Sequence, residues 1–322
     1  MAGEKVKTLR VAAVQMESKN ALVRANLEHA GPFVEEAAQR GAKLVVLPEF
    51  MPTGYLFTRA IWDAAETREG LTVQWLKETS RRFSIYLGTS FLEADGEEFF
   101  NSFVLANPDG TEAGRVRKQT PAAFEAYFTR GAPGSHVIDT DFGRVGVGIC
   151  YENMLSYTPR LMSTHAVDIM LMPHSAPCPM KSILTPQSAV RSFLVNLEGL
   201  AVSYAQLLGI PAVMINKSGP WDTPLPGIPF LTQHSYFPGL SAVADSDGTL
   251  KAQLGGDEGL IVEDVVLDPS RKTHAVPAYT GRWVKEFHWG IRIWRLVETV
   301  GRTWYTISAE RKRRAREVSS GR

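Results

Sequence analysis

Short apolar runs that lack a helical period and end in polar or reactive residues place the strongest constraint on how this chain can fold. Residues 10–16 (RVAAVQM) form one such run, and residues 44–47 (LVVL) form another. A helix-like stretch at 21–40 separates them, with an irregularity expected at Gly31–Pro32. Runs of this kind are typical of buried strands, and the order strand, helix, strand indicates parallel pairing. The sequence therefore predicts an α/β fold.

Further along the chain, a β meander and then more strand–helix units are expected. A helix is expected over 70–83. The meander predicted after it has strands over 85–92, 98–106 and 112–118, with glycine-containing turns at Asp95–Gly96 and Asn107–Gly110. The predicted later elements are an apolar run at 145–150, a helix at 155–164, a strand at 167–172, a helix from Thr185–Pro186 to Gly209 and a strand at 211–216. Residues 102–116 and 241–254 resemble each other as strand, Asp-Gly turn, strand, so two similar halves would suit a two-sheet sandwich with helices outside.

Composition excludes several classes of protein. The 322 residues are 44% hydrophobic and 21% charged, which is ordinary for a globular chain, and 35 basic against 34 acidic residues give no overall attraction to nucleic acid. The only two cysteines, Cys150 and Cys178, exclude a disulfide scaffold and a four-cysteine metal site. The seven histidines show no metal-binding spacing, so we expect no metal and no cofactor. No apolar run is long enough to span a membrane and no signal peptide is visible, so a cytoplasmic location is expected.

Four reactive side chains lie at or near the ends of predicted buried strands, where ligand sites of α/β proteins are usually found. They are Glu49, Lys118, Glu125 and Cys150. Taken singly, each has an ordinary explanation: a buried cysteine behaves as a small hydrophobe, and the others would be solvated surface charges. A cysteine at a strand-to-loop turn is nevertheless a capable nucleophile when a base takes its proton.

Seven segments in collinear order, covering roughly residues 8–270, give these residues a common context. They are RVAAVQM (10–16), LVVLPEFMPTGY (44–55), GRVRKQTPAAFEAYFTRG (114–131), GRVGVGICYEN (143–153), DIMLMPHSAP (168–177), GIPAVMINKSG (209–219) and FPGLSAVADSDGTL (237–250). Together they resemble the nitrilase superfamily of carbon–nitrogen hydrolases.

The resemblance implies a four-layer αββα sandwich over 1–281 and a Glu–Lys–Cys triad. Glu49 would be the general base, Cys150 the nucleophile, and Lys118 with the backbone N–H of Tyr151 would stabilise the oxyanion. Glu125 would be a second glutamate that positions the substrate or the lysine. We further expect the Lys118 cation to lower the pKa of the Cys150 thiol and burial to raise that of the Glu49 carboxyl.

The same resemblance predicts the pocket and the class of substrate. Expected pocket residues are Tyr55, Tyr151, Glu152, His174 and Ser175. The substrate would be a small-molecule amide or nitrile. The nucleophile segment, Cys-Tyr-Glu, is intermediate between the forms of nitrilases and of amidases, so we rank amide hydrolysis first, nitrile hydrolysis second and N-carbamoyl hydrolysis third.

Other classes of function are less consistent with the sequence. A papain-like pair of Cys150 and His174 would leave the lysine and the glutamates without roles. The glycines of GRVGVG (143–148) do not have the spacing of a dinucleotide-binding loop. A protein that kept the fold as an interaction module and lost the chemistry would not need all three residue types of the triad.

The C-terminal segment 282–322 differs in composition from the rest. It carries 11 basic and 4 acidic residues and four of the seven tryptophans, Trp283, Trp289, Trp294 and Trp304. We expect an oligomerisation arm that forms a homodimer or a larger homo-oligomer. The alternatives are attachment to an anionic membrane surface and packing on the chain's own body.

Overall fold

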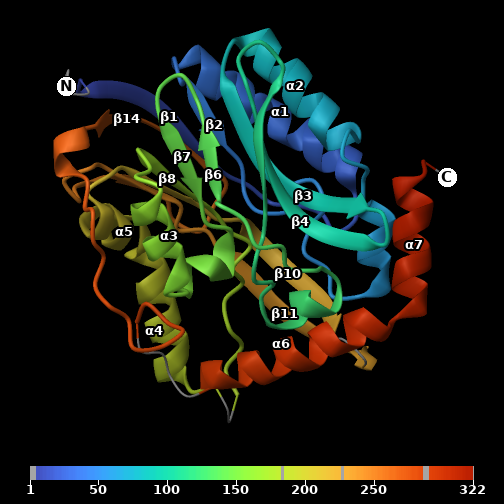
Figure 1. Cartoon of the computed structure of the whole chain (residues 1–322). Helices are drawn as coiled ribbons and strands as arrows, with labels where there is room; N and C mark the ends of the chain where they lie inside the picture. The colour runs from blue at the N-terminus through green and yellow to red at the C-terminus, as the bar shows by residue number, and fades with distance from the viewer. Residues whose placement is uncertain (1–4, 183–184, 226–227, 286–289, 322) are drawn as a thin grey trace.

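The computed structural model describes residues 5–182, 185–225, 228–285 and 290–321 (Figure 1). Its centre consists of two six-stranded mixed sheets with helices on their outer faces. The predicted α/β fold is thereby confirmed. Trp289 of the C-terminal segment lies outside the described residues.

The first sheet comes from the N-terminal half, with one strand added from the end of the body. Its order is β14 (Gly259–Leu267), β1 (Lys7–Gln15), β2 (Leu44–Val46), β3 (Tyr86–Asp95), β4 (Glu98–Ala106) and β5 (Glu112–Arg117). The pairs β1–β2 and β2–β3 are parallel and the other pairs are antiparallel. Parallel strands buried on both faces require continuous apolar sequence, as in the runs RVAAVQM and LVVL.

The second sheet repeats this arrangement. Its order is β13 (Leu250–Gln253), β12 (Ala242–Ala244), β9 (Ala212–Ile215), β8 (Ile169–Pro173), β7 (Arg144–Val147) and β6 (Val137–Asp139). Here β7–β8 and β8–β9 are parallel and the flanking pairs are antiparallel. The sequence echo between 102–116 and 241–254 therefore falls on equivalent strand pairs, β4–β5 and β12–β13. A separate hairpin consists of β10 (Ser218–Leu225) and β11 (Ile228–Pro238).

Side-chain alternation along the strands creates the four layers. Val11 and Ala13 of β1 face the second sheet, whereas Ala12 and Val14 face the outer helices. The outer helices of the first sheet are α1 (Val23–Gln39) and α2 (Leu71–Phe83), and those on the other side are α3 (Tyr157–Thr164), α4 (Gln187–Glu198) and α5 (Leu200–Leu208). Short 3-10 turns are η1 (Arg59–Ala64), η2 (Ala123–Tyr127), η3 (Cys150–Met154) and η4 (Pro269–Arg271).

Three predicted helices differ from the structure in detail. The helix expected from Thr185–Pro186 to Gly209 is interrupted at Gly199, which ends α4 and precedes α5, because glycine has a poor propensity for helix interiors. The helix expected at 155–164 begins two residues later. In α1, Pro32 lies inside a helix that continues to Gln39, so the expected irregularity does not end it.

The C-terminal segment packs on the body of its own chain. It contains α6 (Gly290–Ile307) and α7 (Ala309–Ser319), and Figure 1 shows α6 along one edge of the molecule and α7 beside β3 and β4. The indole of Trp304 stacks on that of Trp62 with ring centroids 6.4 Å apart. Arg311 is 1% exposed and makes an ion pair with Glu98 at 2.9 Å. The alternative of packing on the body is therefore observed, and a further role in assembly stays a prediction.

Candidate active site

Four polar side chains predicted from the sequence meet at one edge of the two sheets. Glu49 follows β2, Lys118 follows β5 directly, Glu125 lies in η2, and Cys150 begins η3 just beyond β7. The carboxyl ends of strands from both sheets thus deliver these groups to one place. The structure therefore brings Glu49, Lys118, Glu125 and Cys150 together.

The Lys118 ammonium lies between two carboxylates. Its Nζ is 2.6 Å from Oε1 of Glu49 and 2.6 Å from Oε2 of Glu125. The amide Nδ2 of Asn101, on β4, donates to the same pair, at 2.8 Å to Glu49 and 3.0 Å to Glu125. Lys118, Glu49 and Asn101 have no exposed surface, and Glu125 is 2% exposed. Buried charges of this kind persist only when they are paired and hydrogen-bonded.

Glu49 connects this pair to the cysteine. Its Oε2 accepts the backbone N–H of Ser175 at 2.8 Å, and its backbone carbonyl accepts the Ser175 hydroxyl at 2.6 Å. The Cys150 thiol lies close enough to Glu49 to lower the pKa of that carboxyl. The two bonds to Ser175 fix Glu49 relative to the loop after β8, close to the Cys150 thiol. A base within hydrogen-bond distance of a nucleophile is the geometry of an activated nucleophile.

The backbone of Cys150 is in the left-handed region, with φ of +53°. A non-glycine residue adopts this region at a cost of about 1–3 kcal/mol, and such strain is often found at active sites. The residue starts a helical turn, whose first N–H groups have no intrahelical acceptor, and the Tyr151 N–H is one of these. The turn thus presents the sulfur together with a nearby hydrogen-bond donor.

Glu152, expected as a pocket residue, lies instead behind the nucleophile and is not among the residues that line the cavity. Its Oε1 accepts the backbone N–H of Gln119 at 2.7 Å and the Tyr157 hydroxyl at 2.7 Å, and its Oε2 accepts the N–H of Ile149 at 2.9 Å. These bonds tie the Cys150 turn to the segment that follows Lys118. The role that the geometry supports is therefore positioning.

Replacing one of the two carboxylate oxygens of Glu152 by an NH₂ group should destabilise the turn that carries Cys150. We expect Glu152→Gln to lower the free energy of unfolding by about 2 kcal/mol, because an amide NH₂ would face a backbone donor that now has a charged acceptor. Urea denaturation followed by circular dichroism measures this, with Glu28→Gln on the exposed face of α1 as the matched control. An unfolding free energy equal to that of the control would contradict the positioning role.

The pKa values of the Cys150 thiol and the Glu49 carboxyl shift in directions opposite to those expected from the sequence. Burial, and then the Glu49 charge, raise the pKa of the Cys150 thiol well above its ordinary value despite Lys118. Burial also raises the pKa of the Glu49 carboxyl, but the Lys118 charge and the hydrogen bonds from Lys118 and Cys150 outweigh it, and this pKa is lowered. Burial and the Glu49 charge raise the pKa of Glu125. The resting pair is therefore a neutral thiol beside a carboxylate.

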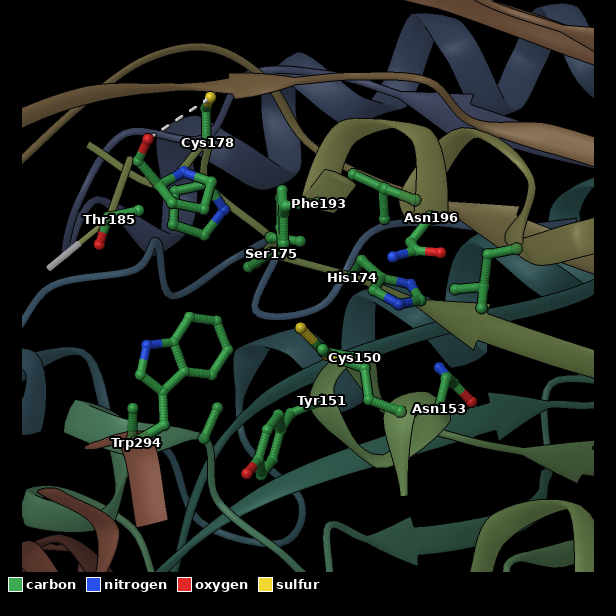
Figure 2. Close-up of a pocket in the computed structure, with 18 of the residues that line it drawn as sticks. Cys150, Tyr151, Asn153, His174, Ser175, Cys178, Thr185, Phe193, Asn196 and Trp294 are labelled. Carbon is green, nitrogen blue, oxygen red and sulfur yellow. Dashed lines mark hydrogen bonds between the residues drawn. The ribbon is translucent and has the colours of Figure 1, made fainter. Parts of the chain in front are cut away.

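A cavity of about 520 Å³ opens over Cys150 (Figure 2). Tyr55, Tyr151, His174 and Ser175 line it, as the sequence predicts, together with Cys150. The His174 ring bonds through Nδ1 to the carbonyl of Met172 at 2.8 Å, and burial lowers its pKa to about 4, so the ring is neutral at pH 7. Glu49, Lys118 and Glu125 are not among the lining residues, but their charges act on the Cys150 thiol.

Three features of the site escaped the sequence analysis. Asn101 was signalled only by a polar residue inside the apolar strand FFNSF. Lys217, fully buried, donates from Nζ to the carbonyl of Phe50 at 2.9 Å, next to the general-base candidate, and burial lowers its pKa to about 7. Trp294 of α6 lines the cavity, although its segment was expected to be a separate arm.

The described residues contain neither a metal-binding cluster nor a membrane-spanning helix. Within the ranges that the structure covers, no group of three or more His, Cys, Asp or Glu side chains could hold a metal ion. No helix in the described part of the chain is long and apolar enough to cross a membrane.

Comparison with known proteins identifies the family of the chain. The model of the carbon-nitrogen hydrolase family matches residues 10–275, so the chain belongs to this family. A nitrilase of Pyrococcus abyssi is 33% identical over 169 residues, which cover 51% of this chain and 64% of that protein. A citrullinase of Francisella tularensis is 32% identical over 175 residues, which cover 51% of this chain and 60% of that protein. The alignments thus span less than two thirds of these relatives.

A solved structure shows the same fold. The carbon-nitrogen hydrolase of Helicobacter pylori superposes with a TM-score of 0.69 at 20% identity, over 82% of this chain and 91% of that one. The four-layer architecture is therefore the one found in solved members of the superfamily.

Proposed function

We propose that this chain hydrolyses the C–N bond of a small-molecule amide and releases ammonia. The observation that supports this most strongly is the position of Cys150 beside the buried cluster in which Lys118 bonds to Glu49 and to Glu125. It supplies a nucleophile, a base and a fixed positive charge within one buried cluster. These are the groups that acyl transfer from an amide requires.

In the first half of the reaction, Glu49 takes the proton of Cys150 as the sulfur attacks the amide carbon. The C–S bond forms, and the carbonyl oxygen becomes an oxyanion near the N–H of Tyr151. The Lys118 charge acts on it through a medium of low dielectric, where Coulomb interactions are strong. Glu49 then gives its proton to the nitrogen, the C–N bond breaks, and ammonia leaves a thioester on Cys150.

In the second half, Glu49 again acts as the base. It takes a proton from water, whose oxygen attacks the thioester carbon, and the C–S bond breaks. The departing sulfur takes the proton back, which restores the neutral thiol, and the product is a carboxylic acid. Lys118 and Asn101 keep Glu49 in place through both halves.

Nitrile hydrolysis is the second candidate, because one of the similar proteins is a nitrilase. The same sulfur would add to the nitrile carbon, and water would release ammonia from the resulting thioimidate. N-carbamoyl hydrolysis is the third. We also expect a homo-oligomer that works in the cytoplasm.

Ammonia release from a panel of amides, nitriles and carbamoyl amino acids tests this assignment. We expect turnover of at least one amide, and Cys150→Ala should be silent in every well because it removes the sulfur that lies beside Glu49 and Lys118. Turnover of nitriles alone would replace the amidase assignment with a nitrilase one. Ammonia release by the Cys150→Ala variant would contradict the mechanism.

A further inference from the structure

We propose that the acyl group of the substrate is bulky, apolar and uncharged, and that Trp294 on the C-terminal helix α6 forms the wall that selects it. This inference deepens the proposed function and rests on it. It concerns which amide or nitrile the cavity admits, a question that the Glu49–Lys118–Cys150 cluster leaves open.

The size and lining of the cavity support an apolar occupant. A volume of about 520 Å³ is in the range of sites that enclose drug-sized molecules. The side chains above Cys150 are mostly aromatic or aliphatic, and they include Phe57, Phe124, Phe193, Leu197, Trp221 and Trp294. An apolar acyl group that enters this space would be stabilised by about 25 cal/mol for each Å² removed from water.

The charges in the cavity argue against an ionised acyl group. Among the described lining residues none is Asp, Glu or Arg, and the two lysines, Lys181 and Lys285, are exposed. His174 is neutral at pH 7 because burial lowers its pKa to about 4. The Lys118 charge is already paired with two carboxylates. The buried Lys217 is not among the lining residues, and its ammonium donates to the carbonyl of Phe50. A substrate carboxylate near Cys150 would therefore find no buried cation on the cavity wall, and burying it there is costly.

Trp294 lies opposite the nucleophile. Figure 2 shows the Cys150 sulfur pointing into the space between the indole of Trp294 and the ring of His174. The Trp294 ring also contacts the ring of Tyr151, next to the nucleophile, with centroids 6.0 Å apart. The indole is therefore within reach of an acyl group attached to the sulfur.

The contacts of α6 hold this wall in place. Glu298 of α6 makes an ion pair at 2.6 Å with Arg282, which lies outside the helix. Gly301 lets α6 approach η2 closely, since a Cβ there would lie 2.6 Å from the Tyr127 ring. The helix that carries Trp294 is thus seated on the turn that carries Glu125, and the wall is positioned relative to the reacting atoms.

Specificity constants for three amides test the proposal. We expect the full chain to hydrolyse phenylacetamide with kcat/KM at least tenfold above those for acetamide and for succinamic acid, which carries a carboxylate. In Trp294→Ala, kcat/KM for phenylacetamide should fall about tenfold while that for acetamide stays within threefold. Leu296→Ala, on the exposed side of the same helix, is the matched control and should leave all three values unchanged.

Two further measurements distinguish a failure of the cavity assignment from a failure of the proposed function. If Trp294→Ala does not fold, as judged by circular dichroism, Phe193→Ala on α4 provides the same comparison from another wall. Calorimetric binding of phenylacetamide and succinamate to Cys150→Ala separates recognition from chemistry. Preferential binding of phenylacetamide without turnover by the unmodified chain would overturn the proposed function and support the cavity assignment. Equal or tighter binding of succinamate, or an equal loss for all amides in both wall variants, would overturn the cavity assignment.

Discussion

Glu49→Gln should lower kcat about 10³-fold for any amide that the chain hydrolyses. The resting cysteine is a neutral thiol, because burial and the Glu49 charge raise its pKa, so attack requires proton transfer to the carboxylate. General-base assistance of this kind typically contributes 10²–10⁴-fold. Glutamine preserves the shape, and its single oxygen can still accept the hydrogen bond from Lys118 while its NH₂ faces the Ser175 N–H, but it cannot take the proton. Steady-state ammonia release measures the loss.

Alkylation of Cys150 by iodoacetamide checks the same prediction without a substrate. The pKa of Glu49 is lowered below its ordinary value, so the carboxylate is ionised throughout pH 5–8, and the unmodified chain should react at a nearly constant rate over that range. In Glu49→Gln only the spontaneous thiolate reacts, so the rate should rise about tenfold per pH unit. Mass spectrometry of the Cys178 peptide in the same sample provides the internal control. A flat profile in the variant would contradict the assignment of Glu49 as the base.

Lys118→Met should abolish measurable turnover and destabilise the fold by about 3–5 kcal/mol, because it leaves two carboxylates buried together without their cation. The catalytic loss has a separate cause, since the charge that stabilises the oxyanion disappears, and one such donor is typically responsible for 10²–10³ in rate. Urea denaturation and ammonia release measure the two effects.

The pH dependence of the variant's stability follows from the same pair. Without Lys118, Glu49 and Glu125 repel each other, so at least one folded-state pKa rises above its unfolded value. The variant should then be most stable below pH ~4.3 and lose stability as the pH rises through the raised pKa. Adding Glu125→Gln should reduce this dependence, because the repulsion between the two carboxylates disappears and only burial still raises the pKa of Glu49. A Lys118→Met variant as stable at pH 7 as the unmodified chain would refute the buried ion cluster.

Much of the fold could be predicted because it depends on local patterns. The strands β3, β4 and β5 were expected within a few residues of their observed bounds, since turn glycines and apolar runs mark their ends. The break of one predicted helix at Gly199 was missed, because a single glycine inside an apolar periodic stretch is a weak signal. The grouping of Glu49, Lys118, Glu125 and Cys150 was expected from collinear motifs rather than from the residues taken singly.

Other parts of the site depend on neighbours that are distant in the sequence. Asn101 reaches both carboxylates from the middle of β4, and Trp294 reaches the cavity from a segment more than 140 residues beyond Cys150. The carboxylate of Glu152 turns away from the cavity because four backbone and side-chain donors surround it. Neither periodicity nor motif spacing contains this information.

By itself the sequence determined the α/β class, the order of most strands and helices up to residue 216 and the residue types available for catalysis, because these follow from hydrophobic period, turn chemistry and short collinear motifs. Only the tertiary structure decided how protons are distributed among Cys150, Glu49 and Glu125, and which side chains enclose the cavity. Desolvation and charge–charge interactions depend on distances and burial in three dimensions, and these are set when both sheets and the C-terminal helix α6 come together around one buried lysine.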